Sequence, residues 1–147
     1  MNIALKFCKE LAKEQGIKLF FKKLNECSAF YDDETKEIFI DSKGLGLNTQ
    51  ISAVFHELGH VHCIKNGLWK KYHSDPPDMR TALRAEVWIE NWAEKEFKKY
   101  FPNGYYGPYD RFYRYDETSR NFLKQYNEQY MPKKKNTKKY KNRKNCD

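Results

Sequence analysis

His56 and His60 are the residues of this sequence whose spacing points most directly to chemistry. On a helix, residues four apart lie about 40° apart around the axis, so one face would offer two imidazole nitrogens to a single zinc ion. Glu57 follows the first histidine and lies about 100° further round the helix. From there its carboxylate can reach a water held by the metal without binding the metal itself. The residues His56-Glu57-Leu58-Gly59-His60 therefore predict a zinc site that activates water, provided that a third ligand exists.

Glu86 is the best candidate for that third ligand. It lies in a long helical stretch, and Glu90 follows it one turn later. Carboxylates amid small and apolar residues are unusual on a surface, but they fit a helix that approaches the histidines closely. Glu90 would then accept the outer N–H of a ligating histidine. The shared helix face comprises Ala82, Glu86, Glu90, Ala93 and Phe97.

His73 is the rival third ligand, and it is equally a candidate for contacting the substrate. The zinc motif with a histidine six residues after the second ligand is excluded, because Asn66 occupies that position. Several further residues could donate a hydrogen bond to the oxyanion of a reacting carbonyl, and the sequence does not choose among them. They are Tyr72, His73, Tyr105, Tyr106 and Tyr109. Cys63 lies on the same helix face as the histidines and either lines the site or fills the core.

Before the histidines, the sequence predicts one helix and a small sheet. Apolar residues at helical spacing predict a helix over residues 2–15, which Gly16 ends. A short strand is expected over residues 17–21. Residues 30–31 and 38–40 flank a polar stretch, which predicts either two antiparallel strands joined by a turn or one strand with a long approach.

The helix that carries the histidines is expected to run through the middle of the domain. Asn48 or Thr49 is predicted to cap it, and Gly67 is predicted to end it. Opposite the histidines lies an apolar stripe of Ile51, Val54, Phe55, Leu58 and Val61. A helix that is apolar on one face and binds metal on the other must be covered on both. We therefore expect the sheet on one side of it and another helix on the other.

Downstream, Pro76-Pro77 marks a loop over residues 70–78, and a long helix is predicted over residues 79–100. An aromatic loop at residues 105–115 and a final helix at residues 116–130 are expected to follow.

These elements predict an α+β fold, with a small antiparallel or mixed sheet packed on a central helix and further helices around it. Residues 1–131 are expected to form a single domain, because the chain is long enough for one hydrophobic core and too short for two domains of ordinary size. Residues 132–147 are expected to be a basic, disordered tail.

The net charge of +8 is concentrated in that tail. Residues 133–147 hold eight of the 28 Lys and Arg residues and one of the 20 acidic residues, so the rest of the chain is nearly neutral. Through residues 133–144 the tail could bind nucleic acid non-specifically, or it could serve solubility alone.

The four cysteines lack paired metal spacing, and neither a signal peptide nor an apolar run long enough for a membrane span is seen. Free thiols in a reducing cytoplasm, without membrane contact, are therefore expected.

Residues 38–93 resemble the ImmA/IrrE-type gluzincin metallopeptidases of bacteria, phages and mobile elements. The similar features are the strand Ile38-Phe39-Ile40, the HELGH helix that continues with Val61-His62, and a downstream helix in which Glu86 is followed by Trp92-Ala93. The resemblance implies a zincin-like fold, zinc ligands at His56, His60 and Glu86, and Glu57 as the catalytic acid and base. It also implies a cytoplasmic protein of a bacterium or a phage-infected cell.

This chain departs from the family pattern at two places. The family usually has Ala-Asn where Ile89 and Glu90 stand here, and its usual Leu-Leu-Met-Pro ending is replaced by a longer stretch to Tyr100-Phe101-Pro102. We therefore expect the substrate cleft to differ from the family more than the metal site does.

The function predicted from these features is a zinc-dependent endopeptidase, with Glu57 as general base, that acts on a specific intracellular protein or peptide. One alternative is a non-catalytic zincin-fold regulator, or a nucleic-acid-associated protein such as a SprT-like DNA-associated protease. SprT-like proteases usually have a histidine followed by glycine as third ligand, whereas Ser74 follows His73 here. A regulator or inhibitor encoded by a mobile element is a third class, although a scaffold would need no general base at position 57.

Overall fold

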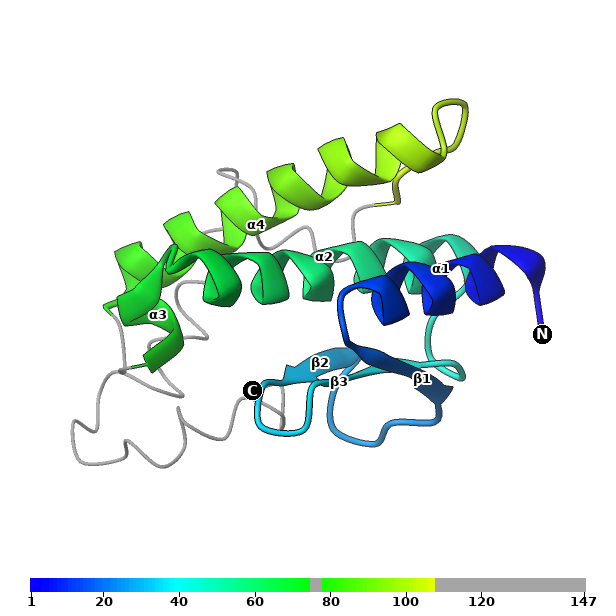
Figure 1. Cartoon of the computed structure of the whole chain (residues 1–147), viewed down its shortest axis with the longest axis horizontal. Helices are drawn as coiled ribbons and strands as arrows, with labels where there is room; N and C mark the ends of the chain where they lie inside the picture. The colour runs from blue at the N-terminus through cyan, green and yellow to red at the C-terminus, as the bar shows by residue number, and fades with distance from the viewer. Residues whose placement is uncertain (75–77, 108–147) are drawn as a thin grey trace.

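A computed structural model of the chain describes residues 1–74 and 78–107. In this part of the chain the fold is α+β, as expected, with helices packed on a three-stranded mixed sheet. The elements form three layers, with the sheet at one side, helices α1 (Ile3–Glu14) and α2 (Leu47–Asn66) in the middle, and α4 (Met79–Tyr100) at the other side (Figure 1). The expected helix at residues 116–130 and the basic tail lie outside the described residues.

Helix α1 and the sheet form where the sequence pattern places them. Asn2 caps α1 by accepting the N–H of Ala4, and Gly16 follows the helix with a φ of 75°, a conformation that glycine adopts without strain. Strands β1 (Lys18–Lys22), β2 (Ala29–Asp32) and β3 (Glu37–Asp41) are arranged in the order β1-β3-β2. β2 pairs antiparallel to β3, which is the first of the two predicted alternatives, whereas β1 pairs parallel to β3. The buried face of the sheet contributes Leu19, Ala29, Tyr31, Ile38 and Ile40 to the core.

Helix α2 runs between the sheet and α4, and residues on all of its sides are buried from Gln50 to Val61. The predicted apolar stripe is buried, and α2 ends at Gly67 with a φ of 67°. The prediction of a cap at Asn48 or Thr49 is wrong. The helix begins earlier, after Gly46, without a side-chain cap, and the Gln50 amide instead donates to the Leu45 carbonyl oxygen.

The segment at residues 70–78 is not only a loop, because it contains the short helix α3 (Lys70–Ser74). The chain enters α3 through Trp69, which has a φ of 51°, a left-handed conformation that is uncommon for a residue with a side chain. Asp78 then caps α4 by accepting the N–H of Thr81 at 2.7 Å. Tyr105, Tyr106 and Gly107 follow α4 without regular structure, and Gly107 lies against Asn48 near the beginning of α2.

Helices α2 and α4 approach each other closely at Gly59. A Cβ atom at this position would lie 2.7 Å from Cγ2 of Ile89 and 3.3 Å from Cε3 of Trp92. Ala82, Ala85 and Ala93 on α4 are fully buried, as expected if small residues allow the two helices to pack at short range. This approach sets the distance between the histidines of α2 and the carboxylates of α4.

Two expectations about cysteines and membranes can be compared with the structure. Cys8 and Cys63 are free and buried, whereas Cys27 is disulfide-bonded, so the expectation of free thiols is wrong at Cys27. None of the helices described is both long and apolar enough to cross a membrane.

Candidate metal centre

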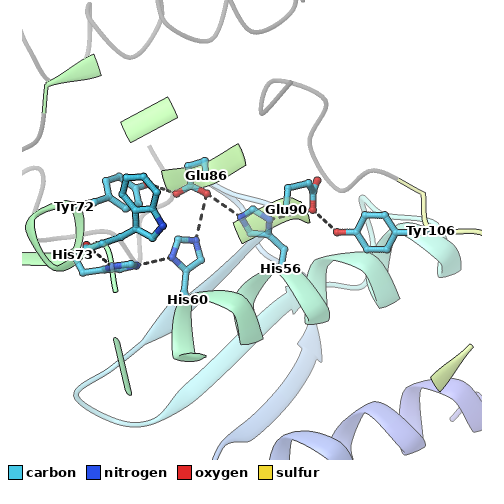
Figure 2. Close-up of polar contacts among 8 residues, drawn as sticks. His56, His60, Tyr72, His73, Glu86, Glu90 and Tyr106 are labelled. Carbon is cyan, nitrogen blue, oxygen red and sulfur yellow. Dashed lines mark hydrogen bonds and ion pairs between the residues drawn. The ribbon is translucent and has the colours of Figure 1, made fainter. Parts of the chain in front are cut away.

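His56, His60 and Glu86 meet between α2 and α4 (Figure 2). The histidines lie one turn apart on α2 and point toward α4, where Glu86 faces them from the adjoining helix. One ligand atom from each residue lies within 4.8 Å of the other two, and all three side chains are at most 2% exposed. The three residues that the sequence suggested as ligands therefore come together in one buried group.

The two distances between Glu86 and the histidines fit a tetrahedral metal ion. Oε1 of Glu86 lies 3.0 Å from Nε2 of His56 and 3.4 Å from Nε2 of His60. Ligands bound to zinc at about 2.0–2.1 Å in tetrahedral geometry are separated by about 3.3 Å. Two imidazole nitrogens and one carboxylate oxygen are also a donor set that zinc prefers.

Glu90 lies one turn beyond Glu86 on α4 and contacts the outer side of His56. Its Oε1 is 3.3 Å from Nδ1 of His56 and also accepts a hydrogen bond from the hydroxyl of Tyr106. An ionised carboxylate only accepts, so His56 donates from Nδ1 to Glu90, and in the neutral ring Nε2, the atom nearest Glu86, keeps the electron pair that a metal ion would bind. This contact with the outer N–H of a histidine is the one that the sequence suggested for Glu90, and it would give a ligating histidine a fixed orientation.

Helix α3 contacts the other two residues of the group. The hydroxyl of Tyr72 donates to Oε2 of Glu86, and Nε2 of His73 lies 3.0 Å from Nδ1 of His60 (Figure 2). His73 thus faces the outer nitrogen of His60, and it does not belong to the group of three that could hold a metal. This geometry does not support His73 as the third ligand.

The buried contacts perturb the acid–base properties of the group. Burial alone would lower the pKa of His56, but its hydrogen bonds to Glu86 and Glu90 and their charges raise that pKa well above its usual range. Burial alone would raise the pKa of Glu86, but the charge of His60 and the hydrogen bonds to both histidines lower it well below its usual range. The group therefore favours positive charge at its centre, whether the charge is carried by protons or by a metal ion.

Glu57 and Cys63 are buried on the same helix. Glu57 follows His56 directly and is 5% exposed, but it is not one of the three residues whose ligand atoms meet. Cys63 is fully buried, and burial, followed by the charge of Glu86, raises the pKa of its thiol to about 12. A thiol with that pKa is protonated at neutral pH, which favours the interpretation of Cys63 as a core residue.

The sequence suggested Tyr72 and Tyr106 only as donors toward a substrate, and it suggested His73 as such a donor or as the rival third ligand. The structure instead directs all three toward the residues of the buried group: Tyr72 toward Glu86, His73 toward His60 and Tyr106 toward Glu90. No spacing rule could have assigned these partners, because each lies in a segment whose path depends on tertiary packing. Tyr105 is exposed, and Tyr109 lies outside the described residues.

Comparison of the chain with protein-family models, curated proteins and solved structures finds no match.

Proposed function

We propose that this chain is a zinc-dependent peptidase. The observation that carries the proposal is the buried group of His56, His60 and Glu86, whose ligand atoms lie within 4.8 Å of one another. The zincin-like fold and the resemblance to ImmA/IrrE-type gluzincins belong to the same proposal. It is supported by the α+β arrangement, in which the helix that carries both histidines lies between a sheet and a second helix.

The number of ligands favours catalysis over a purely structural role for the metal. Structural zinc sites in proteins usually have four protein ligands, whereas catalytic sites have three and leave one position for water or substrate. Among the described residues, only three meet in this group, and the nearby His73 contacts the far side of His60 instead. The group thus has the ligand count of a catalytic centre.

In the proposed mechanism His56 and His60 would hold the metal through Nε2, and Glu86 would hold it through a carboxylate oxygen. A bound zinc ion supplies Lewis acidity, which polarises a peptide carbonyl and lowers the pKa of a water molecule. Glu57 accepts a proton from the attacking water at its carboxylate and returns it to the nitrogen of the leaving peptide. The C–N bond is broken, and water provides the hydroxyl of the new carboxyl group and the proton of the new amine.

The first test of this proposal is the metal itself. Purified wild-type protein is expected to contain one zinc ion per chain by elemental analysis, and Glu86→Ala is expected to lose it. Glu96→Ala is the matched control, because Glu96 lies on the same helix but is partly exposed and paired with Lys99 at 3.0 Å. Wild-type protein without zinc, or Glu86→Ala with full zinc content, would contradict the proposed ligand set.

The second test separates a peptidase from a metal-dependent binding protein. Glu57→Gln is nearly isosteric and removes the general base, so it is expected to retain zinc and to abolish cleavage. Cleavage can be followed by mass spectrometry in a protein mixture from the source cell, since the proposed substrate is a specific cytoplasmic protein. Zinc retention with equal cleavage patterns for wild type and Glu57→Gln would favour the non-catalytic alternative.

A further inference from the structure

Helix α3 makes two polar contacts with the buried group of His56, His60 and Glu86, called the metal group below, although the proposed mechanism assigns α3 no role. It is only five residues long, yet Tyr72 and His73 both point from it toward the proposed ligands (Figure 2). Tyr72 is buried, and its hydroxyl donates to Oε2 of Glu86, the carboxylate oxygen that does not face the histidines. His73 reaches Nδ1 of His60.

Hydrogen bonds link Trp69 to His73 and His73 to His60, and the direction of both follows from the carbonyl group of Trp69. Nδ1 of His73 lies 3.0 Å from the carbonyl oxygen of Trp69, and a carbonyl oxygen can only accept. His73 must therefore carry its proton on Nδ1, which in the neutral ring leaves Nε2 as an acceptor. Nδ1 of His60, at 3.0 Å from that Nε2, must then be the donor.

The consequence for His60 is a single tautomer of its neutral form, which is the form that binds a metal ion. With its proton on Nδ1, neutral His60 has a free electron pair on Nε2, which is the atom 3.4 Å from Glu86. Nε2 can bind a metal ion only in this form. Trp69 is itself held in a left-handed conformation, with φ of 51°, so the backbone at the start of this path is strained. Strain of this kind persists where the surrounding structure requires it.

We infer that α3 positions the metal ligands: His73 fixes the tautomer and orientation of His60, and Tyr72 holds Glu86 with one carboxylate oxygen directed at the metal. The inference rests on the proposed zinc site. His73 and Tyr72 are positioning residues and do not touch the metal. The arrangement parallels that of Glu90 on His56, so each histidine is held from its outer nitrogen by a different element.

Two substitutions at position 73 separate hydrogen bonding from packing. His73→Leu removes the acceptor and is expected to weaken zinc binding about 10–100-fold, the usual effect of losing an outer partner of a ligand. His73→Gln keeps a side-chain oxygen that can accept from His60 and is expected to retain most of the affinity. Zinc dissociation constants are measured on the full chain by competition with a chromophoric chelator.

Two further variants complete the set. Tyr72→Phe keeps the buried ring and removes only the hydroxyl, so it tests the contact with Glu86 even if His73→Leu fails to fold, and about tenfold weaker zinc binding is expected. His62→Leu is the control histidine variant, since His62 stacks on Trp92 at 4.8 Å and is not in the metal group. It is expected to bind zinc like the wild type.

The ring N–H of His60 gives a readout that does not depend on zinc. In ¹⁵N-histidine-labelled protein, a buried and hydrogen-bonded Nδ1–H exchanges slowly with water, so its resonance is expected in the wild type and in His62→Leu and is expected to be lost in His73→Leu. Equal zinc affinities of wild type, His73→Leu and Tyr72→Phe would overturn the inference. Equal losses in His73→Gln and His73→Leu would also overturn it, because they would show a packing role. A wild type that binds no zinc but retains the N–H resonance would overturn the proposed function and leave the hydrogen bond itself supported.

Discussion

Adding one methyl group at Gly59 tests whether the close approach of α2 and α4 creates the site. In Gly59→Ala the new Cβ would lie 2.7 Å from Cγ2 of Ile89, whereas carbon atoms in favourable contact are about 3.5–4.0 Å apart. A relative shift of about 0.8 Å or more is therefore required. Ile89 cannot readily supply that shift by rotating, because it is fully buried and a β-branched side chain has essentially one χ1 rotamer in a helix.

The expected free energy follows from two opposing effects. Replacing glycine by alanine inside a helix stabilises it by about 1 kcal/mol, and overpacking a tight core costs about 1–3 kcal/mol. We expect overpacking to dominate, because the obstructing atom is held in the core, and the free energy of unfolding should fall by up to about 2 kcal/mol. Separation of the helices would also move Glu86 away from His56 and His60, so zinc binding should weaken about tenfold.

The assay is urea unfolding of metal-free protein together with a zinc competition titration. Ile89→Leu removes the Cγ2 methyl that the new Cβ would meet and conserves side-chain volume, so the double variant should be about 1 kcal/mol more stable than the sum of the single effects predicts. If Gly59→Ala is instead about 1 kcal/mol more stable than the wild type, with unchanged zinc affinity, then helix propensity acts alone and the close contact does not exist.

Two further predictions concern the outer contact of Glu90 and the buried thiols. Tyr106→Phe removes only the hydroxyl that donates to Glu90, so zinc binding should weaken about tenfold in the same titration, and an unchanged affinity would show that the contact has no influence on His56. The thiols of Cys8 and Cys63, whose pKa values burial raises to about 12, should resist alkylation at pH 8 in the folded chain and react in urea, as measured by mass spectrometry. Because the folded state favours the protonated thiols, their contribution to stability is complete below the unfolded-chain pKa of about 8.5 and should be lost as the pH rises toward 12.

The sequence predicts most of the helices and strands because their ends are defined by local chemistry. Asn2 caps α1, a left-handed Gly67 ends α2, and α4 has the predicted bounds of residues 79–100. The buried face of α4 was also predictable, since carboxylates among alanines at helical spacing require a polar partner on the adjoining element. At the beginning of α2 the contact that the sequence missed is local: the Gln50 side-chain amide donates to the carbonyl oxygen of Leu45, and the chain is helical from Leu47 without a side-chain cap.

The contacts of α3 could not be predicted in the same way. Tyr72 and His73 lie in the short helix that the chain enters through Trp69, and nothing about a tryptophan in a sequence indicates the left-handed conformation that Trp69 adopts. The hydroxyl of Tyr106 reaches Glu90 because the chain after α4 turns back toward the beginning of α2, where Gly107 lies against Asn48. Such contacts depend on the path of irregular segments, which packing of the whole domain determines.

The charge of the buried group indicates how metal binding relates to folding. Glu86 and Glu90 contact the imidazoles and are at most 3% exposed, and burying two carboxylates is costly unless positive charge accompanies them. Two additional protons, which make His56 and His60 both positively charged, would balance the two carboxylates. One divalent cation with both imidazoles neutral would balance them equally. One zinc ion can therefore replace two protons without changing the net charge of these four side chains. On this charge balance we expect the metal-free chain to fold around a protonated site, in contrast to zinc-finger domains, which remain unfolded without metal. Zinc would then bind to an already formed site and release protons, so its affinity should be limited by competition with protons more than by the free energy of folding.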